Sequence, residues 1–172
     1  QVNRAQATAM YKRVAELAAD ARGGDLRGAK AVDLFAGLGG FGLHLAHAGA
    51  SVVAVEIDRD AIAQLRRAAE RGNLPLKPIA GDAGDLSAEV HGELGKPDVV
   101  VVNPPRKGLS EGARRLLVDL DAPTVIYVSC GPESLGRDLA ALAEHGWKPD
   151  VIEPFDLMPG TAQIETIVRL RR

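Results

Sequence analysis

Short runs of largely aliphatic residues alternate with helical patterns along most of this chain of 172 residues. Five such runs, each ended by turn residues, lie at residues 31–35, 51–55, 76–80, 98–102 and 124–128. Helical patterns lie at residues 4–22, 41–48, 60–71, 111–119 and 133–144. Strands that alternate with helices in this way predict a parallel, doubly wound α/β sheet.

The last part of the chain departs from this alternation. Residues 150–153 and 163–170 have the pattern of two further strands without a helix between them, which predicts an antiparallel hairpin at the sheet edge. A seven-stranded sheet with this ending and helices on both faces resembles the Rossmann-like fold of class I S-adenosylmethionine-dependent methyltransferases. We expect residues 1–172 to form one catalytic domain. The start at Gln1, with no initiator methionine, predicts that it is the C-terminal part of a longer protein.

The composition limits the partners that such a domain can have. Its net charge is −2 and only 3% of its residues are aromatic. We therefore expect neither a global basic field for nucleic acid nor many aromatic platforms for stacking bases, although a local basic patch stays open. One cysteine, no export signal and no apolar run near membrane-spanning length predict a cytoplasmic setting without membrane insertion.

A glycine-rich turn, D-L-F-A-G-L-G-G at residues 33–40, follows the first strand and opens a helix. Gly37 and Gly39 let the backbone approach a ligand closely, and the helix N-terminus presents free N–H groups. The G-x-G-G spacing, with no lysine after it, fits neither a P-loop nor a standard dinucleotide fingerprint. At the end of the second strand, Glu56 is placed to accept hydrogen bonds from ribose hydroxyls; the alternative is a solvated carboxylate at a strand end.

Two further turns lie at the same predicted edge of the sheet. Asp82 follows the third strand, where S-adenosylmethionine enzymes commonly contact the adenine amino group; an Asx turn is the alternative. Asn103, Pro104, Pro105 and Arg106 follow the fourth strand. The two prolines fix the backbone, so carbonyl groups and the Asn103 amide can be held against a planar substrate or the cofactor. Enzymes that methylate amino nitrogens generally place an aromatic residue after N-P-P, and Arg106 at that position weakens the amine interpretation.

Cys130, the only cysteine, opens the Gly/Pro turn after the fifth strand. A lone cysteine serves either packing or thiolate chemistry, and packing is the commoner role of a free cysteine. The other motifs at the same sheet edge favour chemistry.

Together these motifs resemble the catalytic domain of the RNA uracil-5-methyltransferases, S-adenosylmethionine enzymes that act on ribosomal or transfer RNA. The matching stretches are residues 1–3, 33–37, 55–56, 103–108, 128–130 and 155–165. The form N-P-P-R-x-G, where relatives carry D-P-P-R, is most similar to the ribosomal RNA branch. The resemblance implies that Cys130 is the nucleophile and Glu165 the base. It also implies a cofactor site with Gln1, Phe35, Gly37, Gly39, Glu56, Asp82 and Asn103, and substrate contacts from Pro104, Pro105 and Arg106.

The chemistry explains why a thiol and a carboxylate are needed together. Uracil C5 is a weak nucleophile, and addition of a thiolate at C6 generates an enolate whose C5 can accept a methyl group. A carboxylate such as Glu165 then removes the C5 proton, and the cysteine is expelled. The alternative role of Glu165 is that of an outward-facing strand residue.

Several features limit or compete with this interpretation. Relatives often carry histidines where this chain has Gly160 and Gln163, and a single cysteine cannot ligate an iron–sulfur cluster. His44 and His47 are interpreted as ordinary helix residues, with no metal site. The basic residues Arg106, Lys107, Arg114 and Arg115 form either a contact for RNA phosphates or a solvated helix face. The competing functions are methylation of an exocyclic or amide nitrogen, and a cofactor-binding or RNA-binding module without catalysis.

Overall fold

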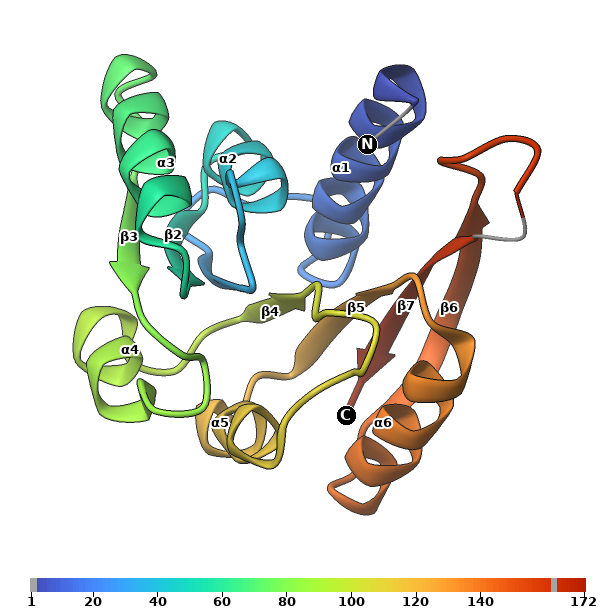
Figure 1. Cartoon of the computed structure of the whole chain (residues 1–172). Coiled ribbons are helices and arrows are strands. Elements are labelled where there is room, and N and C mark those ends of the chain that lie inside the picture. Colours follow the sequence, from blue (N-terminus) through green and yellow to red (C-terminus); the bar gives the residue numbers. More distant parts are fainter. Residues whose placement is uncertain (1–2, 162–163) are drawn as a thin grey trace.

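The computed structural model describes residues 3–161 and 164–172 and shows a seven-stranded sheet covered by helices on both faces (Figure 1). The strands are β1 (Lys30–Leu34), β2 (Ser51–Glu56), β3 (Leu76–Ala80), β4 (Val99–Val102), β5 (Thr124–Ser129), β6 (Lys148–Phe155) and β7 (Glu165–Arg171). The helices are α1 (Arg4–Asp20), α2 (Gly40–His47), α3 (Arg59–Arg71), α4 (Ser87–Leu94), α5 (Glu111–Leu120) and α6 (Pro132–Glu144).

The strand order is β3-β2-β1-β4-β5-β7-β6. The first five of these strands are parallel, and β7 is antiparallel to both β5 and β6. The direction in which the chain builds the sheet reverses between β1 and β4. In an open α/β sheet the ligand crevice lies outside the carboxyl ends of the strands at such a point.

Side chains that alternate along each strand divide the core into two layers. On β5, Val125 and Tyr127 pack with residues of α5 and α6, whereas Ile126 and Val128 pack with residues of α1 and α2. Leu65 of α3 packs against Ala54, on the α1 and α2 side of the sheet. Figure 1 shows the same division, with α1, α2 and α3 on one face and α4, α5 and α6 on the other.

The structure confirms the predicted fold class, with shifts of one or two residues at most element ends. One helix, α4, has no counterpart in the sequence prediction. It is only 8 residues long, contains Gly92, begins without a side-chain N-cap and, among its described side chains, buries only Val90. A short helix with a weak apolar stripe gives little periodic signal. No helix in the described residues is long and apolar enough to cross a membrane.

The edge strands explain why β6 is longer than the predicted 150–153. β6 contains Pro149 and Pro154, whereas the strand predicted from the sequence, 150–153, left both prolines outside. Because β6 is the last strand of the sheet, a residue without an N–H can be accommodated there. β7 begins at Glu165, and Gln163 lies outside the described residues.

Candidate active site

The two glycines of the turn between β1 and α2 have different environments. Gly39, with φ of 86°, packs against Leu65 of α3. Gly37 has φ of 54°, and a Cβ atom there would meet nothing within 4 Å, so the backbone at Gly37 adjoins open space. Phe35 also has a positive φ, 62°, which a non-glycine residue adopts only where the surroundings enforce it. The turn is therefore shaped for close approach by a ligand.

Glu56 joins this turn to the turn after β2. One carboxylate oxygen, Oε2, accepts a hydrogen bond from the Gly37 N–H at 2.9 Å, and Oε1 accepts one from the Asp58 N–H at 2.9 Å. The side chain thus holds two backbone turns at the edge of one cavity. This arrangement is more ordered than a carboxylate left in solvent at the end of a strand.

A cavity of about 420 Å³ gathers most of the residues predicted to bind the cofactor. Its lining consists of Phe35, Glu56, Ile57, Asp82, Asn103, Pro105, Lys107, Gly108 and Ser110. A cavity of this size falls in the range of small-molecule sites. Gln1, the remaining predicted side chain, lies outside the described residues.

Asp82 forms the Asx turn that was one of its two predicted roles, and it also lies at the cavity. Its Oδ1 accepts a hydrogen bond from the Gly84 N–H at 2.7 Å, which is the Asx turn, and its side chain also lines the cavity. Asn103 follows β4, and its N–H donates to the Leu34 carbonyl at 3.2 Å. This bond places the N-P-P segment beside the end of β1. The cofactor roles of both residues stay predictions.

Asp33 was part of the motif but received no role in the sequence analysis. It is fully buried; Oδ2 accepts a hydrogen bond from the Gly42 N–H at 2.7 Å, and Oδ1 has no partner among the described residues. Burial raises the pKa of Asp33 to about 7, the Gly42 N–H opposes the rise, and the negative charge of Glu56 adds to it. The signal available in the sequence was an acidic residue inside an aliphatic strand.

Replacement of Asp33 by Asn should change how stability depends on pH. Because the pKa of Asp33 is higher in the folded chain than the ordinary value near 4, the folded state holds an extra proton between these values. The stabilisation is complete below about pH 4 and is lost as the pH rises through about 7. We expect the wild type to lose on the order of 2 kcal/mol more than Asp33→Asn between pH 5 and 8, measured by urea unfolding. Equal losses in both proteins would show that Asp33 is ionised when folded.

Cys130 and Glu165 lie at the ends of neighbouring strands. In the antiparallel β5–β7 pair, Ser129 is opposite Thr166, and the next residue outward on each side is Cys130 or Glu165. On β5 and β7, Val128 and Ile167 pack on the α1 and α2 face. Since side chains alternate along a strand, Cys130 and Glu165 are directed to this same face. Two residues 35 positions apart in sequence are therefore brought together by the sheet.

The turn that contains Cys130 is tied by local hydrogen bonds. The Ser129 Oγ accepts from the Gly131 N–H at 3.0 Å, and the Ser134 hydroxyl donates to the Gly131 carbonyl at 3.0 Å. The Cys130 thiol is free and half-buried, and Cys130 is not part of the hydrophobic core clusters. Partial exposure at the carboxyl edge suits a reacting thiol better than a packing residue.

The structure does not support an outward-facing role for Glu165. Its Oε2 is buried without a hydrogen-bond partner among the described residues. Burial raises the pKa of Glu165, and the positive charge of Arg106 partly opposes this. Phe155 is opposite Glu165 on β6, and Leu157, two residues further along, is buried in the core beneath α1 and α2. A desolvated carboxylate with a raised pKa is suited to accept a proton near neutral pH.

Tyr11 of α1 is a second residue near the site that the sequence analysis missed. Its ring makes an edge-to-face contact with Phe41, with ring centroids 5.0 Å apart. Burial raises the pKa of Tyr11, and the negative charges of Asp33 and Glu165 raise it further. Tyr11 is thus close to both carboxylates, between the cofactor turn and the predicted base. The position of Tyr11 in the amphipathic pattern of residues 4–22 did not predict that it lies near these carboxylates.

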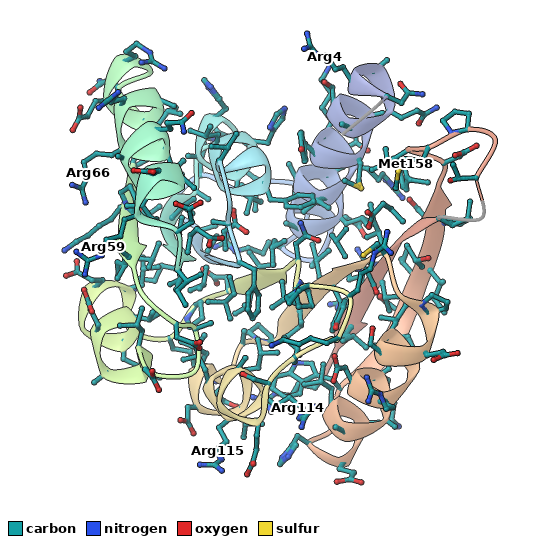
Figure 2. All side chains as sticks on the ribbon, in the orientation of Figure 1. Arg4, Arg59, Arg66, Arg114, Arg115 and Met158 are labelled. Atoms are coloured by element: carbon teal, nitrogen blue, oxygen red, sulfur yellow. The ribbon has the colours of Figure 1, made fainter. Side chains whose placement is uncertain are left out.

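The predicted basic cluster is divided in the structure. Arg114 donates to Asp138 and to the Leu109 carbonyl, both at 3.0 Å, and Arg115 pairs with Glu111 within α5. Figure 2 labels both arginines on α5. Arg106 and Arg137, however, line a cavity of about 250 Å³ at the start of α6, beside the Cys130 turn. His44 bonds through Nδ1 to the Gly40 carbonyl at 2.8 Å, as an ordinary helix residue does.

Comparison with known proteins places these features in a family. Residues 94–172, which include Cys130 and Glu165, match the model of the tRNA (uracil-5-)-methyltransferase family. The chain belongs to the RNA (uracil-5-)-methyltransferase family. Residues 28–119 also match the model of the RNA cap guanine-N2 methyltransferases. That match runs from β1 into α5 and ends before Cys130, so it includes neither Cys130 nor Glu165.

Individual relatives support the assignment of this chain to the uracil-5-methyltransferase family. An uncharacterized RNA methyltransferase of Enterococcus faecalis is 35% identical over 100% of this chain and 37% of its own length. The 23S rRNA (uracil(747)-C(5))-methyltransferase of Shewanella loihica is 35% identical over 81% of this chain and 36% of its own. The tRNA (uracil-54, C5)-methyltransferase of Pyrococcus abyssi, solved with S-adenosyl-L-homocysteine, is 29% identical with a TM-score of 0.81, covering 96% of this chain and 38% of that one. The chain therefore spans somewhat more than a third of the length of these relatives.

Proposed function

We propose that this chain is the catalytic domain of a longer enzyme that uses S-adenosylmethionine to methylate uracil C5 in RNA. The observation that carries the proposal is the placement of Cys130 and Glu165 at adjacent strand ends, at the carboxyl edge of the parallel strands where the glycine-rich turn after β1 also lies. Ribosomal RNA is the proposed substrate, because the N-P-P-R-x-G segment resembles the ribosomal branch and the Shewanella relative acts on 23S rRNA. The Pyrococcus relative makes transfer RNA the alternative.

The cavity at the end of β1 fits this cofactor. Glu56 and Asp82 line the cavity, and open space adjoins Gly37. Carboxylates around the cavity match the positive charge of a sulfonium and the hydroxyl and amino groups of adenosine. When bound there, S-adenosylmethionine supplies an electrophilic methyl group. Glu56 would hold the ribose hydroxyls, and Asp82 the adenine amino group.

Cys130 begins the reaction on the uracil ring. Its thiolate forms a bond to C6, and the electron pair of the C5–C6 double bond moves toward O4, which makes C5 nucleophilic. The Cys130 thiol is partly exposed at the end of β5. In this proposal the nucleobase reaches the thiol from the side of the Asn103–Pro105 segment. Pro104 and Pro105 fix the backbone that would lie against the planar ring.

Glu165 completes the reaction after the methyl group has been added to C5. Its carboxylate accepts the C5 proton, the released electron pair re-forms the C5–C6 double bond, and the C6–sulfur bond breaks to return Cys130 as a thiolate. Burial raises the pKa of Glu165, which makes it a stronger base than a solvated carboxylate. The positive charge of Arg106 partly opposes this rise in the pKa and so favours the ionised form.

RNA backbone contacts are assigned to the cavity at the start of α6. Arg106 and Arg137 both line it, and it adjoins the turn that carries Cys130. This pair replaces the cluster with Arg114 and Arg115 that the sequence suggested. Two arginines beside the reacting thiol would hold a phosphate near the target nucleotide.

Replacement of Glu56 by Ala should weaken S-adenosylmethionine binding by about 1–3 kcal/mol, because a ribose hydroxyl pair loses its acceptor. Titration calorimetry on the purified chain measures this, and Glu70→Ala on the exposed side of α3 serves as the control. Equal affinity in Glu56→Ala and the wild type would remove Glu56 from the site. Tighter binding of NAD than of S-adenosylmethionine would contradict the cofactor assignment.

A second candidate function is methylation of an exocyclic or amide nitrogen. It is favoured by the match of residues 28–119 to the guanine-N2 methyltransferases and by the Asn103-Pro104-Pro105 segment. Mass spectrometry of RNA from cells that lack the full-length protein separates the two. Loss of one 5-methyluridine supports the proposed function and names the RNA, whereas loss of a methylated amine supports the alternative.

A further inference from the structure

The buried carboxylate of Asp138 lies on the α5 and α6 face of the sheet. It links the segment predicted to contact substrate with α6, the helix that follows Cys130. Asp138, in the middle of α6, is 2% exposed. Its Oδ2 accepts hydrogen bonds from the Leu109 N–H at 2.8 Å and from the Tyr127 hydroxyl at 2.6 Å. Its Oδ1 accepts one from Arg114 at 3.0 Å. One side chain thus joins α6, β5, α5 and the segment before α5.

The contact between this segment and α6 is close along its length. Gly108, with φ of 83°, passes so near to α6 that a Cβ atom there would lie 2.5 Å from Asp138 Oδ2 and 3.0 Å from Ser134 Cβ. Arg137 donates to the Lys107 carbonyl at 3.1 Å. Burial and the hydrogen bond to Asp138 also raise the pKa of Tyr127, so the phenol remains a donor. Residues 107–109 are therefore fastened to α6 over more than one helical turn.

The same segment and the same helix carry residues of the proposed reaction. Arg106 precedes Lys107, and α6 begins two residues after Cys130. A Cβ atom on Gly131 would lie 3.0 Å from the Arg106 carbonyl and 2.8 Å from Ser134 Oγ, so the two turns are in contact. Tyr127 is three residues before Cys130 on β5. Any shift of residues 107–109 relative to α6 must change the separation between Arg106 and the thiol.

We propose that Asp138 is a positioning residue, which holds the Asn103–Leu109 segment against the Cys130 turn and so sets the distance between the thiol and the uracil ring. The inference rests on the proposed function. Asp138 accepts three hydrogen bonds in a buried site, although such polar groups together with their partners can often be replaced by apolar residues without loss of stability. Its placement between the two reacting segments gives it a role in alignment.

The test measures the rate of covalent adduct formation in the full-length protein with Glu165→Gln, in which the adduct is expected to accumulate. RNA and S-adenosylmethionine are both saturating. Asp138→Asn places an amide group among three donors and should slow adduct formation about 10- to 100-fold, because small misplacements of reacting groups cost this much. Because Asn103, Pro105, Lys107 and Gly108 of the held segment also line the cofactor cavity, the affinity for S-adenosylmethionine is measured alongside, and the rates are compared at saturating cofactor. Arg114→Met removes a partner that is 36% exposed and leaves the Leu109 and Tyr127 hydrogen bonds to Asp138 in place, and it should also slow the reaction at saturating RNA.

Asp150→Asn is the matched control. Asp150 accepts two hydrogen bonds from Arg169, both at 2.9 Å, toward the other end of β7. It is more exposed than Asp138, but the same change from carboxylate to amide there removes a pairing with arginine without affecting alignment at the Cys130 turn. Adduct formation at the unmodified rate in Asp138→Asn, or equal slowing in Asp150→Asn, would overturn the inference. The inference would also be overturned if Arg114→Met changed only the RNA concentration needed for half-saturation and not the rate at saturating RNA. That result would indicate that Arg114 contacts an RNA phosphate. Absence of any adduct in Glu165→Gln alone overturns the proposed function and the inference with it.

Discussion

Replacement of Glu165 by Gln will allow attack by Cys130 and methyl transfer, and will then stop the enzyme as a covalent protein–RNA complex. The amide is nearly the size of the carboxylate but cannot accept the C5 proton, so the C6–sulfur bond has no route to elimination. Turnover should fall on the order of 10³-fold or more, while the first methyl transfer remains visible. Denaturing electrophoresis of the full-length protein with labelled RNA shows the complex as a slowly migrating band.

Glu153→Gln is the control for that experiment. Glu153 lies on the neighbouring strand β6, opposite Ile167, and pairs with Arg13 at 2.7 Å. The same chemical change there should leave turnover close to wild type and give no stable complex. Normal turnover in Glu165→Gln would show that another group removes the proton.

Replacement of Cys130 by Ala will abolish both methylation and the covalent complex. Without the thiolate, C5 has no route to become nucleophilic, and the rate should fall on the order of 10⁴-fold or more. The cofactor cavity does not include Cys130, so the affinity for S-adenosylmethionine should stay close to that of the wild type. The rate is measured by transfer of a labelled methyl group, and the affinity by calorimetry on the same preparation.

Three outcomes of this second experiment would contradict the role proposed for Cys130. If Cys130→Ala still methylates uracil, the covalent mechanism is wrong. If it methylates an exocyclic or amide nitrogen, the second candidate function holds, since a nitrogen nucleophile needs no thiol. A loss of cofactor affinity in the variant would instead point to a structural role for the Cys130 turn.

The order of strands and helices was predictable because central strands of a parallel sheet are continuous aliphatic runs. β4 consists of four valines that are all buried, and such a run admits few other interpretations. α4 was not predictable, because its one buried described side chain, Val90, leaves no periodic stripe. Pro149 and Pro154 concealed the true length of β6, which depends on its place at the sheet edge.

The residues of the candidate site also form two groups, those that the sequence could predict and those that it could not. Residues that belong to a local motif, such as Gly37, Asn103 and Cys130, could be selected from their place after a predicted strand. Residues whose role depends on distant contacts could not. Tyr11 feels the charges of Asp33 and Glu165 only in the folded chain, and Asp138 accepts a hydrogen bond from Leu109, 29 positions away in sequence. Arg114 was interpreted as either an RNA contact or part of a solvated helix face, because the sequence does not reveal its buried partner, Asp138.

The central claim is that Cys130 forms the bond to uracil C6, and peptide mapping of the trapped complex tests it most directly. The Glu165→Gln protein is incubated with RNA and S-adenosylmethionine, digested with protease and nuclease, and analysed by mass spectrometry. The account predicts one modified peptide, in which Cys130 carries a nucleotide with an added methyl group. A complex attached through any other residue, or attached RNA without a link at Cys130, would contradict it.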